Sequence, residues 1–382
     1  MTAGEAATVA VLKVSEGASD IVSLEMILGE RRLAGRAELA EAMRILASQA
    51  VPGDAAGELG DVPPGAFHEP RLYSQLVRPG FESMTLAQLL YGGLAERPAV
   101  IVARTDAAGV LSLPGVGTLA TGLPGAEVRL RRDEAARAFV VRDAGGESRT
   151  CALRPSAFAA GMEIVGWLDP MLGRFLADHM DDAQELVLVD DPRRYQGPIT
   201  RALDLIAVVR PEFHVWLVES LRGVLLFRHP HAESFAALGM HGMIFLNVPR
   251  QTTAAYFVEQ LTHQGGHVVF SEATLRRADF FLVDPETPLA EWAGRDDPRT
   301  VYDAFHGLYT EHMETQVYRA ILEQGPTSRD ESADLRELLA TTAKRHAADL
   351  ELIAPHARRI FSDTGLTVFA EFQSSRESET HG

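Results

Sequence analysis

Two histidines spaced four residues apart are the strongest chemical feature of the sequence. His263 and His267 lie in the segment EQLTHQGGH, within an amphipathic pattern that predicts a helix from about Thr253. Positions i and i+4 of a helix share one face, so the two imidazoles can bind one metal ion. This is the only HxxxH pair in the chain. Two solvated histidines on the polar face of a helix would have the same spacing, and that reading stays open.

The residue after the first histidine separates two kinds of metal chemistry. Zincin hydrolases carry HExxH, in which the glutamate activates zinc-bound water, whereas this chain has Gln264 there. An amide cannot take a proton from water near neutral pH. The motif therefore indicates a disabled hydrolase or metal chemistry that needs no protein base. Gly265 and Gly266 each cost a helix about 1 kcal/mol relative to alanine, which indicates a close neighbour or space beside the metal.

A third metal ligand and an anion-binding group are expected downstream. His306 lies in an apolar context that suits either a ligand or a hydrogen-bonded core residue, while Glu311 and His312 are expected on a solvated face. Arg299 precedes His306 by seven residues, about two helical turns on the same stripe. A metal beside an arginine is the pairing that holds a 2-oxo acid. An exposed arginine at the start of a helix is the alternative reading of Arg299.

The rest of the chain must position these groups. A helical pattern over residues 21–50 is followed, from residue 99, by short β-branched runs that predict a β-meander ending near residue 155. After it the pattern predicts a long helix over 199–221, then strands GVLLFRH and GMIFLNVP. We expect GMIFLNVP to be the edge strand that binds an extended substrate. Helices are predicted over about 300–323 and 332–356.

Composition excludes several classes of protein. With 36 basic and 53 acidic residues, the formal net charge is −17, which disfavours a nucleic-acid partner. The single cysteine, Cys151, excludes a disulfide framework and a thiolate-rich metal site. The N-terminal segment lacks the pattern of a secretory signal, and no run of about 18 apolar residues predicts a membrane helix. We therefore expect a cytoplasmic protein.

A series of segments resembles a known family over roughly residues 160–372. The family is that of the HExxH-type peptide β-hydroxylases of ribosomal peptide biosynthesis, which are regarded as iron(II)- and 2-oxoglutarate-dependent. Residues 1–155 show no comparable match. The matching segments, in order, are GWLDPMLGRF, VDDPRRYQGPI, GMIFLNVPR, EQLTHQGGH, WAGRDDPRT, AFHGLY and FSDTGLTVFAEF.

The resemblance implies a set of site residues. The metal ligands would be His263 and His267 on one helix and His306 on a later one. Arg295 and Arg299 resemble a W-R-x-D-P-R stretch of the family, and we infer that they bind 2-oxoglutarate. Gln264 departs from the family pattern, which leaves open that this member has lost activity.

These features together predict an α+β protein. Residues 156–382 would form a zincin-like metal-binding domain, mainly helical with a small sheet, after a mixed helical and β-rich region, 1–155, that recognises substrate or mediates dimerisation. The predicted function is oxygenation, with Fe(II) and 2-oxoglutarate, of an amino-acid side chain at its β-carbon. The substrate would be a peptide or a carrier-presented amino acid in natural-product biosynthesis. The alternatives are a zinc metallopeptidase and an inactive peptide-binding relative. We expect no membrane partner, and a homodimer stays open.

Overall fold

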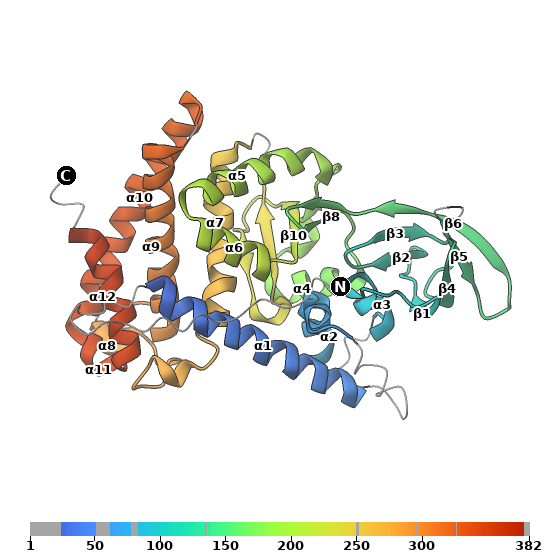
Figure 1. The fold of residues 1–382 in the computed structure, drawn as a ribbon, viewed down its shortest axis with the longest axis horizontal. Coiled ribbons are helices and arrows are strands. Elements are labelled where there is room, and N and C mark those ends of the chain that lie inside the picture. Colours follow the sequence, from blue (N-terminus) through green and yellow to red (C-terminus); the bar gives the residue numbers. More distant parts are fainter. Residues whose placement is uncertain are drawn as a thin grey trace, which may run out of the picture.

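The computed structural model describes residues 24–50, 62–77, 83–133, 136, 138–249, 252–294, 296–325 and 327–377. The molecule is elongated, with a small β unit at one end, a sheet with helices in the middle, and long helices at the other end (Figure 1). Residues 1–23 and 51–61 lie outside the described residues, so the first three residues of the helical pattern predicted over 21–50 lie there too.

The predicted β-meander forms a nearly closed antiparallel sheet in the order β1-β4-β5-β6-β3-β2. Alternate side chains point into its core, as the period of two requires. Gln88, on helix α3 (Leu86–Leu90), bonds the backbone of Arg104 on β1 and of Ser112 on β2, and so joins the two edge strands. The strands are β1 (Val100–Arg104), β2 (Val110–Leu113), β3 (Gly117–Ala120), β4 (Glu127–Asp133), β5 (Ala138–Arg142) and β6 (Ser148–Pro155).

A second sheet, in the order β11-β12-β10-β8-β7, forms the centre of the molecule, and β9 pairs with β10. β10 is parallel to β8 and to β12 and is buried on both faces, which explains its continuous apolar sequence. The prediction that GMIFLNVP forms an edge strand is wrong, because β11 pairs with its outer side. The strands are β7 (Ala157–Ala159), β8 (Met162–Val165), β9 (Val187–Leu188), β10 (Gly223–Arg228), β11 (Phe235–Ala236) and β12 (Met243–Asn247).

Helices cover both faces of this second sheet. Val224 and Leu226 of β10 join a core with α5, α6, α7 and α9, whereas Leu225 and Phe227 join a core with α1, α2 and α4. Successive side chains of β10 thus point alternately into the helical layers on the two faces of the sheet. The helices are α1 (Leu24–Ala50), α2 (Pro70–Val77), α4 (Pro170–His179), α5 (Gln196–Val209), α6 (Pro211–Ser220), α7 (Ala254–Ala273), α8 (Ala290–Ala293), α9 (Val301–Gln324), α10 (Arg329–Ile353), α11 (Ala357–Ile360) and α12 (Asp363–Glu377).

The single helix predicted over 199–221 is two helices. Pro211 begins α6, and Arg210 before it has φ −142° and ψ 69°, which ends α5. A proline has no N–H to donate and restricts the residue before it, so the chain turns at this point. The helices predicted from Thr253 and over 300–323 are confirmed as α7 and α9.

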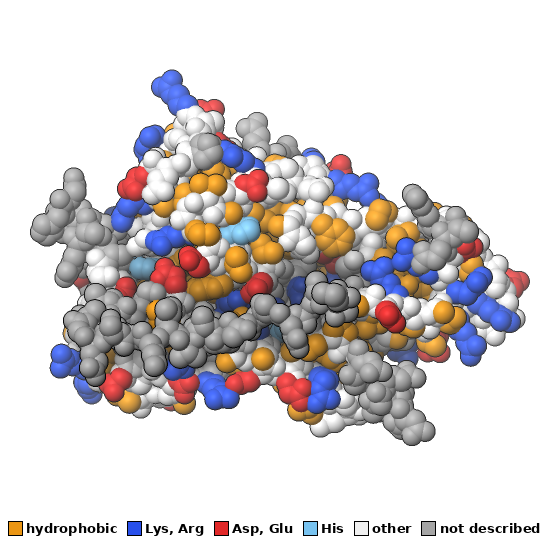
Figure 2. Space-filling view, in the orientation of Figure 1, with side chains coloured by type: hydrophobic (Ala, Val, Ile, Leu, Met, Phe, Trp, Pro, Cys, Tyr) orange, Lys and Arg blue, Asp and Glu red, His pale blue; other side chains and the backbone are white. Residues whose placement is uncertain are grey.

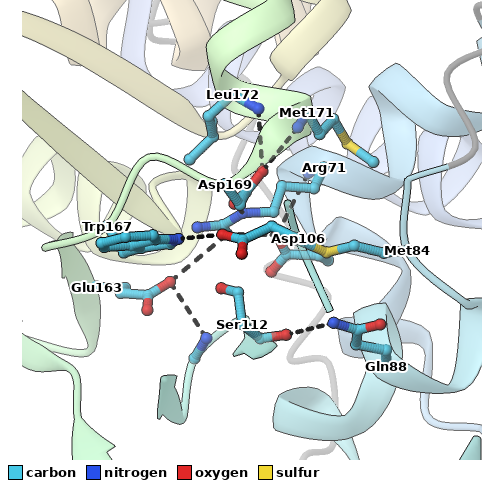
Figure 3. A network of polar contacts seen from close by, with 12 residues as sticks. Arg71, Met84, Gln88, Asp106, Ser112, Glu163, Trp167, Asp169, Met171 and Leu172 are labelled. Atoms are coloured by element: carbon cyan, nitrogen blue, oxygen red, sulfur yellow. Dashed lines mark hydrogen bonds and ion pairs between the residues drawn. The ribbon is translucent and has the colours of Figure 1, made fainter. Parts of the chain in front are cut away.

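A buried arginine ties the β unit to the central sheet (Figure 3). Arg71 on α2 donates from Nε to Asp169 at 2.8 Å and contacts Glu163 of β8 at 3.6 Å. Glu163 in turn accepts the backbone N–H of Gly115, in the turn between β2 and β3. A second link joins the indole N–H of Trp167 to Asp106 at 3.1 Å. Because buried charges are stable only when paired, these contacts fix the orientation of the β unit.

The chain is a mixed α/β protein in which helices predominate. Residue 155 marks the end of the β1–β6 unit, which has its own core. Helix α1 packs along α7, so this early part of the chain belongs to the same body as the later helices. No helix in the described part of the chain combines the length and apolar character that crossing a bilayer requires.

Candidate metal centre

The structure brings the three predicted histidines together. His263 and His267 lie on α7 and His306 lies on α9, which packs against α7. The Nε2 atoms of His263 and His267 are 3.2 Å apart, and Nδ1 of His267 lies 3.0 Å from Nε2 of His306. The sequence spacing therefore predicted correctly which imidazoles are neighbours.

The His263–His267 pair has a spacing that fits a divalent ion. Two nitrogens about 2.1 Å from one ion, at roughly 90–110° to each other, are about 3.0–3.4 Å apart. Nδ1 of His263 faces Oε1 of the buried Glu314 at 3.3 Å. A carboxylate behind the non-ligating nitrogen is the usual partner of a metal-binding histidine, because it fixes the ring and its tautomer. Nε2 of His263 is thereby left to bind the ion.

His306 contacts the opposite side of His267. Its Nε2 lies 3.1 Å from the backbone carbonyl oxygen of His267, so this nitrogen carries the proton and donates it. Nδ1 of His267 then accepts, and its Nε2–H donates to Nε2 of His263, so an ion bound by both Nε2 atoms would displace this proton and require His267 and His306 to take their other tautomers. Among the described residues, no three His, Cys, Asp or Glu side chains form a preformed metal-binding group. The structure thus presents two imidazoles for an ion and places His306 as a support of His267.

Burial keeps His267 and His306 neutral. Desolvation, together with the neighbouring His306 and His263, lowers the pKa of His267 well below its usual value. Burial also lowers the pKa of His306 to about 4. Neutral imidazoles have the free lone pair that a metal ligand needs.

Gln264 has a hydrogen bond that a glutamate at this position could make only when protonated. Its amide nitrogen donates to the backbone carbonyl of Ser234 at 3.1 Å, and the residue is buried. Ser234 immediately precedes β11, so the amide ties the edge strand to α7. Gln264 is therefore a structural donor in this site rather than a proton acceptor.

The imidazoles line a cavity of about 480 Å³, a size typical of small-ligand sites. The edge strand β11 forms one wall, and α7 and the start of α9 form others. Among the residues that the structure describes, no strand pairs with the outer edge of β11, an arrangement that suits pairing with an extended chain. The lining residues are Glu233, Ser234, Phe235, Ala236, Ala237, Leu238, His241, His263, Gln264, His267, Val268, Ser271, Arg277, Glu286, Tyr302, Asp303 and His306.

The structure does not bring Arg299 to this cavity. Its guanidinium donates hydrogen bonds to the carboxylates of Asp297 and Asp349 and forms an ion pair with each. These carboxylates raise the pKa of Arg299 further above its usual value. Arg299 therefore fastens α10 to the start of α9, and Arg295 lies outside the described residues.

Arg277, which sequence reasoning missed, is the arginine that lines the cavity. Its guanidinium carbon lies 3.8 Å from the centre of the Tyr302 ring, and it also pairs with Glu286. Tyr302 in turn lies against His306, with ring centres 5.3 Å apart. Arg277 lies in a 3-10 turn after α7 (Arg277–Asp279), and this turn sets the direction of its side chain. No periodic pattern in the sequence therefore marks it.

A second histidine with a carboxylate partner reaches the same cavity. Nε2 of His241 lies 3.2 Å from Oε1 of Glu272, which is fully buried on α7. Glu272 also accepts from Ser220 at 2.6 Å and from Arg36 at 2.8 Å. Burial raises the pKa of this carboxyl, but His241 and Arg36 outweigh it, and the net effect lowers the pKa. Glu272 thus connects the cavity wall to α1.

Two expectations about neighbouring residues are resolved. Glu311 and His312 are buried, so the predicted solvated face is wrong. α10 covers that side of α9, a contact that the local sequence does not reveal.

The two glycines of α7 allow close packing. A Cβ on Gly265 would lie 2.5 Å from Leu217, and one on Gly266 would lie 3.3 Å from Thr310.

No protein-family model matches the chain, and no curated protein sequence matches it either. The resemblance to the peptide β-hydroxylases stays a prediction.

Proposed function

We propose that the chain is an iron(II)- and 2-oxoglutarate-dependent oxygenase of zincin-like fold. It would hydroxylate a side chain, at the β-carbon, in a peptide of natural-product biosynthesis. The observation that supports this most is the pair of facing Nε2 atoms on His263 and His267, with Glu314 behind His263, in a cavity that also contains an arginine. A metal and a cation in one cavity suit a 2-oxo dicarboxylic acid.

Each wall of the cavity has a role in this proposal. His263 and His267 hold the ion, and His306 orients the His267 ring from behind. Arg277, whose guanidinium lies over the Tyr302 ring and pairs with Glu286, would exchange that partner for the distal carboxylate of the co-substrate. With O₂ and the co-substrate, iron(II) supplies the oxidising power that removes hydrogen from carbon. The edge of β11 binds the peptide backbone, so that a substrate side chain reaches into the cavity.

Gln264 favours oxygenation over hydrolysis. Its amide is committed to the Ser234 carbonyl and has no proton-accepting form near neutral pH. A zinc peptidase would need another carboxylate as its base. Glu286, one of the carboxylates of the cavity, is already paired with Arg277. Removal of hydrogen from carbon requires no such base.

A non-catalytic peptide-binding protein is the second candidate, and one observation favours it. The imidazoles form a continuous set of contacts, from the His267 carbonyl through His306 and His267 to His263. Such a chain satisfies the polar groups of the site without an ion. The same peptide-binding edge of β11 would be retained.

Anaerobic titration with Fe(II) tests the proposal. We expect one equivalent to bind, and addition of 2-oxoglutarate to produce the visible charge-transfer band of a chelated 2-oxo acid. His263→Ala and His267→Ala should abolish both signals, whereas His231→Ala, at an exposed histidine, should change neither. Candidate peptides should then stimulate succinate release. Absence of iron binding would favour the peptide-binding protein, and cleavage of peptides by the zinc-loaded chain would favour the peptidase.

A further inference from the structure

The outer face of the β1–β6 sheet carries an unusual concentration of arginine. Residues 100–155 contain eight arginines and six acidic residues, so this unit is net positive in a chain of net charge −17. Figure 2 shows basic side chains gathered over the end of the molecule that this unit forms. The unit therefore has a net charge opposite in sign to that of the whole chain.

Strand register places three of these arginines on one exposed face. Arg129 of β4 is directly opposite Arg142 of β5, and Arg131 follows two positions along β4 on the same face. Neighbouring strands are about 4.8 Å apart, and alternate residues of a strand are about 6.8 Å apart. Three guanidinium groups thus lie within a patch a few strands wide.

The pairing of Arg129 with Arg142 is electrostatically unfavourable for the folded sheet. Like charges directly opposite each other on adjacent strands destabilise a sheet. Within the described part of the chain, Arg129, Arg131 and Arg142 have neither an ion pair nor a hydrogen bond from their side chains. A negatively charged ligand would remove this repulsion.

Apolar side chains lie beside the arginines, on β1, which neighbours β4 on the side away from β5. Val102 pairs with Arg129 and Val100 pairs with Arg131 across β1 and β4, and the two valines are 41% and 50% exposed. A groove of about 400 Å³ runs beside Val102, Arg129 and Arg142. These valines add an apolar margin to the row formed by Arg129 and Arg131.

The acidic groups at the rim of this groove are already engaged. Glu127 lies 3.8 Å from Arg104, and Asp143 accepts the backbone N–H of Glu147 at 3.0 Å. Both carboxylates keep their negative charge: Glu127 pairs with Arg104, and Asp143 alone stands against the positive charges of Arg129, Arg131 and Arg142.

We propose that this arginine–valine face, formed by Val100, Val102, Arg129, Arg131 and Arg142, binds a short acidic peptide segment in extended conformation. Carboxylates two residues apart in an extended chain have the spacing of arginines two residues apart on a strand. A nucleic acid fits less well, because it would extend from this small face onto the acidic remainder of the chain. The proposal does not depend on the metal chemistry.

Fluorescence anisotropy with the full chain tests it. The probe is a labelled peptide of alternating Glu and Val, compared with one of alternating Lys and Val. We expect saturable binding of the acidic peptide alone, weakened by salt. The double variant Arg129→Gln/Arg142→Gln should weaken binding by about tenfold or more. The matched control is Arg329→Gln/Arg336→Gln, which removes the same charge from exposed positions of α10.

The outcomes separate a site from a general charge effect. Equal weakening by both double variants, or no saturable binding by the unaltered chain, would overturn the proposal. So would an RNA oligonucleotide that displaces the peptide at lower concentration than unlabelled peptide does. Because the Arg129→Gln/Arg142→Gln variant relieves repulsion, its melting temperature should not fall, and loss of binding then reports the site rather than unfolding.

Discussion

The amide of Gln264 and the carbonyl of Ser234 are joined by a 3.1 Å hydrogen bond that links the histidine-bearing helix to the edge strand of the central sheet. The residue that distinguishes this motif from HExxH therefore has a positive structural role. It positions β11 beside the imidazoles while leaving the site without a base at this point.

Replacement of this amide by a carboxylate should destabilise the chain. In Gln264→Glu a buried carboxylate would face a carbonyl oxygen with no proton between them, and we expect a loss of about 1–3 kcal/mol in the free energy of unfolding. Gln264→Met, which removes the donor without adding charge, should cost less. Urea unfolding measures both. A Glu variant as stable as the unaltered chain would contradict the structural role of the amide.

The two glycines of the motif should respond differently to alanine. In Gly265→Ala the new Cβ would overlap Leu217, and overpacking of about 1–3 kcal/mol should exceed the helix preference of about 1 kcal/mol. Gly266→Ala has only a 3.3 Å contact with Thr310 and should keep the helix gain. Urea unfolding of the two variants should therefore give a lower stability for the first and an equal or higher one for the second. The reverse order would contradict the packing described for α7.

Sequence reasoning succeeded where the information is local. Thr253 and Thr300 cap α7 and α9, and each side chain accepts a backbone N–H of its own first turn. Such caps and the apolar periodicity are readable in the sequence, so the helices that carry His263, His267 and His306 were predicted.

Features that depend on tertiary contacts could not be predicted in this way. β11 has only two residues and forms through pairing with β12, so no local pattern marks it as the edge strand. Glu311 and His312 look polar in sequence and are buried only because α10 packs on α9. Arg299 was assigned to the co-substrate from helical spacing and from the resemblance, and Arg277 was not considered. Asp349, fifty residues away in sequence, binds the Arg299 guanidinium.

Burial of Glu311 should make stability fall as pH rises. Burial first, then the charges of Asp349 and Glu314, raise its pKa to about 8, against the opposing effect of Arg345 and Arg299. Between its usual pKa of 4.5 and about 8, the folded chain keeps a proton that the unfolded chain releases. This group alone therefore lowers the free energy of unfolding by up to about 1.4 kcal/mol per pH unit in that window.

Glu311→Gln tests this dependence. The variant should be close to the unaltered chain in stability near pH 4.5 and should become increasingly more stable up to about pH 8. Thermal unfolding at a series of pH values measures the difference. Glu323→Gln, at an exposed position of the same helix, is the control. A constant difference between Glu311→Gln and the unaltered chain across this range would show that the carboxyl is not held protonated by the fold.

The two arginines should separate binding from stability. Arg277→Gln should weaken 2-oxoglutarate binding to the Fe(II)-loaded chain by about tenfold or more, because the cavity loses its charged donor. Arg299→Gln should leave that affinity unchanged and lower the free energy of unfolding by about 2 kcal/mol, since Asp349 would be left buried without its partner. Titration calorimetry and urea unfolding measure the two effects. Loss of co-substrate binding in Arg299→Gln alone would restore the assignment made from sequence.

Glu314 should set the affinity of the metal centre without touching the ion. Its carboxylate faces Nδ1 of His263 at 3.3 Å, and removal of such a partner typically weakens metal binding by about 10–100-fold. Glu314→Gln keeps the size of the side chain and should weaken Fe(II) binding by that factor in anaerobic titration. Glu323→Gln, a matched change on the same helix outside the site, should have no effect. Unchanged iron affinity in Glu314→Gln would mean that His263 does not bind the ion through Nε2, because the carboxylate then has no influence on the ligand it faces.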